Sequence, residues 1–305
     1  MKIHYTLKRD DDAPLVLAIG FFDGMHRGHQ DIARKTRALR KPGWSSGVLT
    51  FSNHPSAFLR PGSEPPLIST PDERIDLLAR AGYEECFFVP FDSAVASQTP
   101  DEFLKKTLIE NLGVHGVAVG RTFRFGHGRE GDVTLMERVL KENDIVFAPV
   151  DIAADENGER ISSTRIRKLV ADGDLPAADR LLGHAYELRG AVMSGAGRGH
   201  GMGFPTANIA VPEKLLPPDG VYAGTARHEG RDYATLVSIG TNPTFEGKNR
   251  TIEAWLRDFH DTIYGHELAL RDLRFVREQR KFANADELLA QMEDDAHAVP
   301  YPAFG

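Results

Sequence analysis

The chain has 305 residues, of which 41% are hydrophobic and 27% charged, a composition that excludes global disorder and predicts about two domains. Lys and Arg number 37 and Asp and Glu 44, a formal net charge of −7 that argues against a dedicated nucleic-acid partner. The single cysteine, Cys86, excludes an intramolecular disulfide and a cysteine-rich zinc site. The apolar runs are far shorter than the ~20 residues of a membrane span, and the first residues lack a secretory apolar region. We therefore expect a soluble, cytoplasmic protein that is a monomer or a weak homo-oligomer.

The first half alternates short apolar runs with helix-like segments. Predicted strands cover 15–20, 46–51, 86–89, 114–120 and 145–150, and predicted helices cover 28–40, 71–81, 100–111 and 132–142. Thr70 and Thr99 each precede a proline and have a glutamate three residues later, which predicts a capping box. Continuous apolar strands alternating with helices predict a Rossmann-like α/β domain, with a parallel sheet covered by helices on both faces.

The pattern changes after a short predicted helix at 175–183. Segments with period-2 alternation then follow, separated by glycine-rich turns, at 185–193, 219–227, 232–240, 251–259 and 268–276. Several short strands at this spacing predict a small antiparallel β-barrel or sandwich. A capped helix is predicted to follow it at 284–292. We expect domains of residues 1–183 and 184–305, with the boundary near Gly183.

A glycine-rich turn follows the first predicted strand, with the sequence GFFDGMHRGH from Gly20 to His29. The first strand–helix turn of an open α/β sheet is a frequent phosphate site, and the helix N-terminus there offers unpaired N–H groups. His26 and His29 would add two imidazole donors to a polyphosphate whose P–O bond breaks, and we take both as catalytic candidates. An ordinary turn with two incidental histidines is the alternative, and a zinc site lacks a nearby third ligand. The residues predicted to contact ATP are Gly20, Phe22, Asp23, Gly24, His26, Gly28 and His29.

This turn resembles the GxFDGxHxGH signature of the nucleotidyltransferases that make FAD from FMN. Three further segments, FSNHP (51–55), VGRTFRFGHGREGD (119–132) and ISSTRIR (161–167), match the same family in order. The resemblance implies that the HxGH histidines bind the ATP phosphates, and that a second motif clamps the triphosphate. That motif supplies Ser162, Ser163 and Thr164, with either Arg165 or Arg167 as the forked donor. Alone, that motif would be an ordinary N-capped surface helix. Candidate flavin contacts are Asn53, Phe58 and Phe125, of which either phenylalanine could equally be core. Thr122 departs from the Asp or Asn that relatives usually carry.

The second half begins with alternate glycines between Gly195 and Asn208, and the chain contains no P-loop motif. These glycines, among them Gly197, Gly199 and Gly203, allow an anion-binding backbone concavity for ATP. Thr206 and Asn208 alternate along the next predicted strand, so both point to one face and suit Mg²⁺ beside nucleotide phosphates. The alternative is a flexible glycine hairpin followed by a strand.

The segment GFPTAN (203–208) closely resembles the signature of riboflavin kinase. Five more segments match that family in order: PPDGVYAG (217–224), IGTNPTF (239–245), RTIEAWLRDF (250–259), YGHEL (264–268) and FVREQRKF (275–282). The resemblance implies that Thr206 and Asn208 bind metal and phosphates, that a glycine-rich flap covers ATP, and that Glu253 is the catalytic base. His200 and Trp255 depart from residues usual in the family.

Together, the motifs resemble the bifunctional riboflavin kinase/FMN adenylyltransferase family along nearly the whole chain. Membership implies ATP-dependent phosphorylation of riboflavin to FMN in the C-terminal domain. The N-terminal nucleotidyltransferase domain would then join AMP to FMN, giving FAD and pyrophosphate, with Mg²⁺ in both sites. One alternative, motivated by Thr122, is a riboflavin kinase whose first domain only binds flavin or nucleotide. Another is a different nucleotidyltransferase built on the same first domain.

Overall fold

The computed structural model describes residues 1–193, 206–210, 213–241, 250–280, 282 and 285–298. The chain divides into two compact units, Met1–Ser163 and Thr164–Gly305, which are described separately below. Helix α8 (Leu175–Leu182) packs against a strand of the second unit, so the helices ahead of Gly183 go with that unit. The domain boundary near Gly183 stays a prediction.

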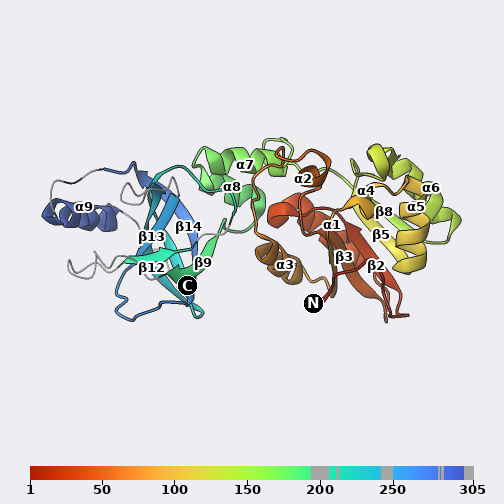
Figure 1. Ribbon diagram of the computed structural model, residues 1–305, viewed down its shortest axis with the longest axis horizontal. Helices are drawn as coiled ribbons and strands as arrows, with labels where there is room; N and C mark the ends of the chain where they lie inside the picture. Colours follow the sequence, from red (N-terminus) through yellow and green to blue (C-terminus); the bar gives the residue numbers. More distant parts are fainter. Residues whose placement is uncertain (194–205, 211–212, 242–249, 281, 283–284, 299–305) are drawn as a thin grey trace. The chain divides into compact units, whose positions relative to one another are not determined.

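The first unit is built on a six-stranded sheet whose paired strands all run parallel (Figure 1). Its strands, in the order β1-β4-β3-β2-β5-β8 across the sheet, are β1 (Lys2–His4), β4 (Glu85–Val89), β3 (Ser45–Phe51), β2 (Leu15–Ile19), β5 (Val114–Gly120) and β8 (Val146–Val150). The chain leaves β2 in one direction for β3 and β4, and later returns to the other side of β2 for β5 and β8. Strands β2 and β5 therefore flank the topological switch point of the sheet.

Helices cover both faces of this sheet, which confirms the predicted α/β class. They are η1 (Asp23–Met25), α1 (Arg27–Ala38), α2 (Pro55–Leu59), α3 (Pro71–Arg80), α4 (Ser93–Ala96), α5 (Pro100–Glu102) with its π-helical continuation η2 (Phe103–Asn111), η3 (His127–Arg129) and α6 (Val133–Glu142). A short pair, β6 (Arg124–Phe125) and β7 (Gly131–Asp132), precedes α6. Both predicted capping boxes are present, because Thr70 caps α3 with Glu73 and Thr99 caps α5 with Glu102.

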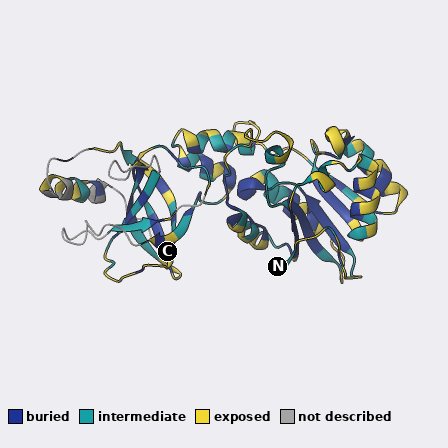
Figure 2. Ribbon diagram, in the orientation of Figure 1, coloured by how far each residue is buried: buried dark blue, intermediate teal, exposed yellow. Residues whose placement is uncertain are grey.

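Central strand β2 is buried on both faces, as its unbroken apolar sequence predicts (Figure 2). Leu15, Leu17 and Ile19 belong to a cluster with side chains of η2 and α6. Ala18 lies in a second cluster with side chains of α1 and α3. The two clusters form the core on either side of the sheet and fix the carboxyl end of β2, from which the glycine-rich turn leaves.

The second unit is a closed antiparallel barrel, which decides between the two β architectures expected from the sequence. Its strands, in the order β10-β13-β12-β11-β14-β9 around the barrel, are β10 (Thr206–Ile209), β13 (Arg250–Leu256), β12 (Arg231–Thr241), β11 (Gly220–His228), β14 (Glu267–Arg277) and β9 (Leu188–Met193). Val237, Ile252 and Ala254 are fully or almost fully buried. Helices α7 (Ser163–Ala171) and α8 precede the barrel, and α9 (Ala285–Ala298) follows it.

Helix α9 is tied to the barrel through Asp295, whose buried carboxylate accepts hydrogen bonds from Arg277 of β14 at 2.7–3.0 Å. The helix runs beyond the predicted segment 284–292. In the described part of the chain, no helix combines the length and the apolar character that a membrane span needs.

Candidate active sites

The glycine-rich turn lies at the switch point of the parallel sheet, where ligands of open α/β folds bind. Its backbone takes the left-handed conformation at Phe22 (φ +57°), Gly24 (+70°) and Met25 (+37°). This conformation is costly for residues with a side chain. Phe22 and Met25 are 1% and 2% exposed within the core, so packing stabilises the turn. The Phe22 side chain is therefore part of the core and not available to a ligand.

Asp23 supports the turn from a buried position. Its carboxylate accepts hydrogen bonds from the backbone N–H groups of Ile68 and Ser69 and from Ser69 Oγ, at 3.0–3.1 Å. Ser69 Oγ in turn accepts a bond from the Gly24 N–H at 3.0 Å. Asp23 thus links the turn to the segment ahead of α3, and its carboxylate is engaged there.

A buried arginine, Arg74 of α3, holds the same region from the other side and was not expected from the sequence. Its guanidinium donates to the carbonyl oxygens of Phe21 at 3.3 Å and Phe51 at 2.7 Å, at the ends of β2 and β3. It also lies 4.2 Å from the centre of the Phe21 ring. Burial lowers the pKa of Arg74, and the nearby Asp23 opposes that shift. Nothing in the sequence around Arg74 distinguishes it from an ordinary surface residue of an amphipathic helix.

His26 and His29 stand together at the start of α1, as the sequence predicts. His26 caps the helix by accepting the His29 N–H on Nδ1 at 3.4 Å, and the two rings stack 3.6 Å apart. Burial lowers the pKa of His29 well below its ordinary value, and the charge of His26 adds to this effect. The buried Nδ1 of His29 has no hydrogen-bond partner. Since buried polar atoms are normally paired, the free nitrogen favours a ligand at this turn.

Gly28 leaves the room that the stacked pair needs. A side-chain carbon at this position would lie 3.3 Å from two atoms of the His26 ring. Gly20 has a comparable role, because an added carbon would lie 3.1 Å from the Phe22 ring. An added side-chain carbon at either glycine would therefore crowd an aromatic ring of the turn.

The second predicted nucleotide motif meets the turn at one described contact. Ser163 Oγ donates to the backbone oxygen of Asp23 at 3.4 Å, across 140 residues of sequence. Ser162 precedes it and is half-buried. Thr164, which is exposed, and Arg165, which is half-buried, continue α7 in the second unit.

The three candidate flavin residues have different surroundings. Asn53 uses both ends of its amide on the backbone of Phe91, at 2.7 and 3.1 Å. Phe58 is 42% exposed, with its ring 6.1 Å from that of Phe91. Phe125 is buried in the core and packs against the rings of Phe103 and Phe123. Phe58 is thus the one of the two phenylalanines whose ring is available to a ligand.

In the barrel, strand register brings together residues from two separate motifs. Asn208 of β10 lies directly opposite Glu253 of β13, and Thr206 lies opposite Trp255. Because alternate residues of a strand share a face, these four side chains occupy one face of the barrel wall. All four are half-buried, whereas Ile252 and Ala254 between them are buried. The hydroxyl, carboxamide and carboxylate oxygens on this face are ligands that suit a hard divalent cation.

Further residues on the neighbouring strand support this face. Ser238 of β12 lies opposite Glu253 on its other side, and its Oγ accepts a hydrogen bond from Gln279 at 3.0 Å. Trp255 packs against an apolar cluster of Val221, Ala223 and Leu236. The sequence did not single out Ser238 or Gln279, whose proximity depends on barrel closure. Gly197, Gly199, Gly203 and His200 lie outside the described residues.

The chain thus combines a parallel sheet whose glycine-rich turn lies at the switch point with a barrel that carries a hydroxyl–amide–carboxylate face, an arrangement that fits a two-domain transferase. A family model of FAD synthetase matches residues 8–165, and one of riboflavin kinase matches residues 182–300. The chain belongs to the bifunctional riboflavin kinase/FMN adenylyltransferase family.

Full-length relatives support the assignment. The bifunctional riboflavin kinase/FMN adenylyltransferase of Listeria monocytogenes is 34% identical, over 96% of this chain and 94% of its own. That of Escherichia coli K12 is also 34% identical, over 95% and 93%. A solved structure, described as a macrolide-efflux protein from Streptococcus pneumoniae, matches with a TM-score of 0.86 and 31% identity, over 97% of this chain and 98% of its own.

Proposed function

We propose that the second unit transfers the γ-phosphoryl group of ATP to riboflavin, and that the first unit joins the resulting FMN to AMP from a second ATP. The observation that carries this proposal is the succession of both family matches along one chain. It is supported by the pairing of His26 with His29 in the first unit and of Asn208 with Glu253 in the second.

The barrel face suits phosphoryl transfer to a primary alcohol. The 5′-hydroxyl oxygen of riboflavin would bond to the γ-phosphorus while the bond to the β,γ-bridging oxygen breaks, and ADP leaves. Glu253 is positioned to accept the hydroxyl proton as a general base. Thr206 and Asn208 would hold Mg²⁺ through their oxygens, and the bound ion supplies neutralisation of phosphate charge.

The turn in the first unit suits adenylyl transfer. A phosphate oxygen of FMN would bond to the α-phosphorus of ATP while the bond to the α,β-bridging oxygen breaks, and pyrophosphate leaves. The FMN phosphate is already ionised, so this step needs no general base. His26, His29 and the N-terminal N–H groups of α1 would donate hydrogen bonds to the triphosphate as charge moves onto the leaving group. Ser162, Ser163, Thr164 and Arg165 are the further phosphate contacts in this proposal.

We further propose that both reactions take place in the cytoplasm, where ATP is available, with the enzyme as a monomer or weak homo-oligomer. The negative net charge is in keeping with small-molecule substrates and no nucleic-acid partner. Mg²⁺ is part of this proposal for both sites.

The second candidate function is a riboflavin kinase whose first unit binds nucleotide or flavin without catalysis. It is favoured by Thr122, which is exposed just beyond the end of β5 at the switch point. A threonine there lacks the carboxylate or carboxamide that the family pattern carries at this place.

Supplying FMN directly separates the two candidates. With FMN, ATP and Mg²⁺, chromatography should show FAD and an equal amount of pyrophosphate. A parallel incubation with riboflavin reports the kinase and shows that the preparation is active. FMN formation from riboflavin without any conversion of supplied FMN would establish the non-catalytic alternative. Faster conversion by Thr122→Asp than by wild type would show that Thr122 limits the reaction.

A further inference from the structure

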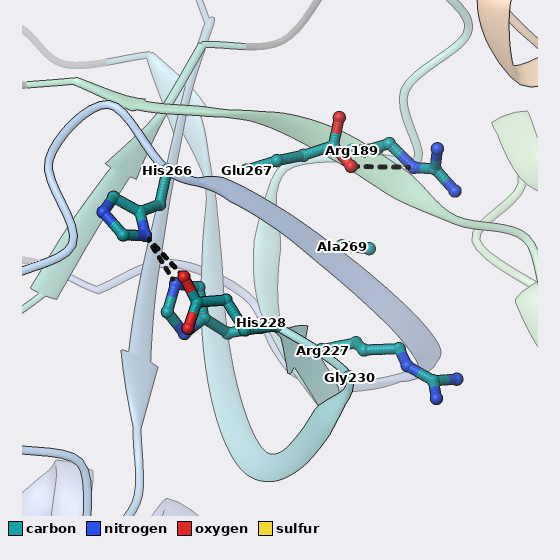
Figure 3. A pocket seen from close by; sticks show the side chains of 8 residues that line it. Arg189, Arg227, His228, Gly230, His266, Glu267 and Ala269 are labelled. Atoms are coloured by element: carbon teal, nitrogen blue, oxygen red, sulfur yellow. Dashed lines mark hydrogen bonds and ion pairs between the residues drawn. The ribbon is translucent and has the colours of Figure 1, made fainter.

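A pocket in the barrel unit brings two histidines and a glutamate together (Figure 3). It lies away from the proposed kinase site. His228 ends β11, Glu229 follows in the hairpin to β12, and His266 directly precedes β14. His228 pairs with Arg231, whereas Glu253 pairs with Ser238 seven residues further along β12. Seven residues of a strand span about 20 Å, so the two places are distinct.

The ligand atoms of this cluster have the spacing of a metal site. His228 Nε2 lies 3.2 Å from His266 Nδ1, and His266 Nδ1 lies 3.3 Å from Glu229 Oε1. All three ligand atoms lie within 4.8 Å of one another. Around a tetrahedral ion with bonds of about 2.0–2.1 Å, neighbouring ligand atoms are about 3.4 Å apart. The cluster therefore needs only a small adjustment to surround one ion.

Hydrogen bonding alone serves the cluster poorly. His266 Nδ1 faces both His228 Nε2 and the Glu229 carboxylate. If His266 Nδ1 carries a proton, that single proton must be shared between His228 Nε2 and the Glu229 carboxylate. If it carries none, its lone pair faces the negatively charged carboxylate. A cation among the three atoms would satisfy a lone pair from each of them.

The backbone holds the three ligands in place. Glu229 (φ +46°) and Gly230 (φ +80°) form the tight two-residue hairpin turn between β11 and β12. His228 is 7% exposed and packs edge-on against Phe259 at 5.8 Å. Its imidazole is thus fixed by packing, while the more exposed Glu229 and His266 can adjust around an ion.

The arginines that line the pocket do not oppose a cation. Arg189 forms ion pairs with Glu187 and Glu267, and Arg227 forms one with Asp232. Figure 3 shows both guanidinium groups directed away from the two imidazole rings. The charge next to the ligand nitrogens is that of the Glu229 carboxylate.

We propose that His228, Glu229 and His266 bind one divalent transition-metal ion of borderline softness, such as Zn²⁺. A water would occupy the fourth position. Two imidazoles and a carboxylate select zinc-like ions over Mg²⁺, which prefers oxygen ligands only. The ion would clip the β11–β12 hairpin to the start of β14 and so stabilise the barrel. The site is independent of the flavin reactions, so its test does not depend on them.

The test is Zn²⁺ binding by the full chain without an affinity tag, in excess Mg²⁺, measured by competition with a chromogenic chelator. We expect one Zn²⁺ per wild-type chain and a rise in thermal stability on binding. His266→Gln should lower the Zn²⁺ affinity by at least about 100-fold. Substitution of residues that only support metal ligands already lowers metal affinity by about 10–100-fold. Glu229→Gln should lower it by at least about tenfold.

The matched control is His260→Gln, which changes an exposed histidine in the segment that leads to β14. It should bind Zn²⁺ as wild type does. Both ligand variants change exposed side chains, so circular dichroism should show wild-type folding. Wild-type protein that binds no Zn²⁺ at about 100 µM free metal, a concentration that would fill even a weak site appreciably, would overturn the proposal. Unchanged affinity in both His266→Gln and Glu229→Gln would overturn it equally.

Discussion

The stacked histidines at the start of α1 combine a neutral ring with a buried nitrogen that has no hydrogen-bond partner. The low pKa of His29 keeps its ring neutral near pH 7, so it can stack closely on His26 without charge repulsion. Its unpaired Nδ1 leaves one polar atom for an incoming group. The pair therefore offers hydrogen bonds without requiring the turn to hold two positive charges.

We predict that His29→Asn lowers FAD formation from FMN by at least about 100-fold, the scale of losing one donor to developing charge. FMN formation from riboflavin should stay near the wild-type rate. Initial rates from chromatography measure both reactions. His115→Asn, which changes an exposed histidine of the same unit, is the control. If His29→Asn makes FAD at the wild-type rate, this turn takes no part in the reaction.

We predict the opposite pattern for Glu253→Gln. The amide cannot accept the riboflavin hydroxyl proton, so FMN formation should fall by about 100- to 10,000-fold, while FMN-to-FAD conversion persists. Glu293→Gln, on the exposed surface of α9, controls for the loss of a charge. If the kinase rate of Glu253→Gln equals that of wild type, Glu253 has a structural role only.

The sequence singled out candidate chemical residues, but not the residues that support them. The histidines of the turn and the Thr206–Asn208 pair stand in recognisable motifs, and strand alternation places the latter pair on one face. Arg74 and Ser69 support the turn through contacts with residues 22 or more positions away in sequence. Such contacts depend on how the sheet and α3 pack, which local patterns do not encode.

At the scale of elements, long periodic segments were predicted well. All five predicted strands of the first unit and the paired Thr-Pro caps are present. Strand β1, with three residues, is too short to show a period, and it forms by pairing with β4. The choice of barrel over sandwich depends on β9 pairing with both β10 and β14, a long-range closure.

Helix α8 carries a carboxylate whose burial opposes stability at neutral pH. Asp179 accepts a hydrogen bond from the Tyr186 N–H at 2.6 Å. Burial raises its pKa from 3.8 to about 6, and that hydrogen bond only partly offsets the shift. Between pH ~4 and ~6 the folded state thus binds more protons than the unfolded state. The contribution of Asp179 to the free energy of unfolding therefore falls as the pH rises through that window.

We predict that Asp179→Asn stabilises the protein above pH 6, because the amide oxygen still accepts from Tyr186 without a desolvated charge. The gain should be about 1–2 kcal/mol, after discounting for the partial exposure of the group. Thermal unfolding at pH 7.5 should therefore shift upward by a few degrees. The difference should shrink as the pH approaches 4. A variant less stable than wild type at pH 7.5 would contradict this reading of Asp179.

At the scale of the whole molecule, the barrel is complete within its own unit. All six strands that close it lie between Leu188 and Arg277, and none comes from the first unit. The packing of α8 on β14 and the bond from Tyr186 to Asp179 tie the preceding helices to the barrel. A kinase fragment should therefore be more stable with those helices than without them.

We predict that fragments 164–305 and 187–305 both phosphorylate riboflavin with ATP and Mg²⁺ and make no FAD. The longer fragment should unfold at the higher temperature, because it keeps α7 and α8. Calorimetry and chromatography measure the two properties. A folded 187–305 fragment without kinase activity, beside an active full chain, would show that the kinase site needs residues ahead of the barrel.

The central claim is that one chain carries two separate sites that act in succession on the flavin. Mixing the two site variants tests it most directly. With riboflavin, ATP and Mg²⁺, neither His29→Asn nor Glu253→Gln alone should make appreciable FAD. An equimolar mixture should make it, because FMN released by the first variant is adenylylated by the second. FAD in the mixture no greater than in either variant alone would contradict two independent sites.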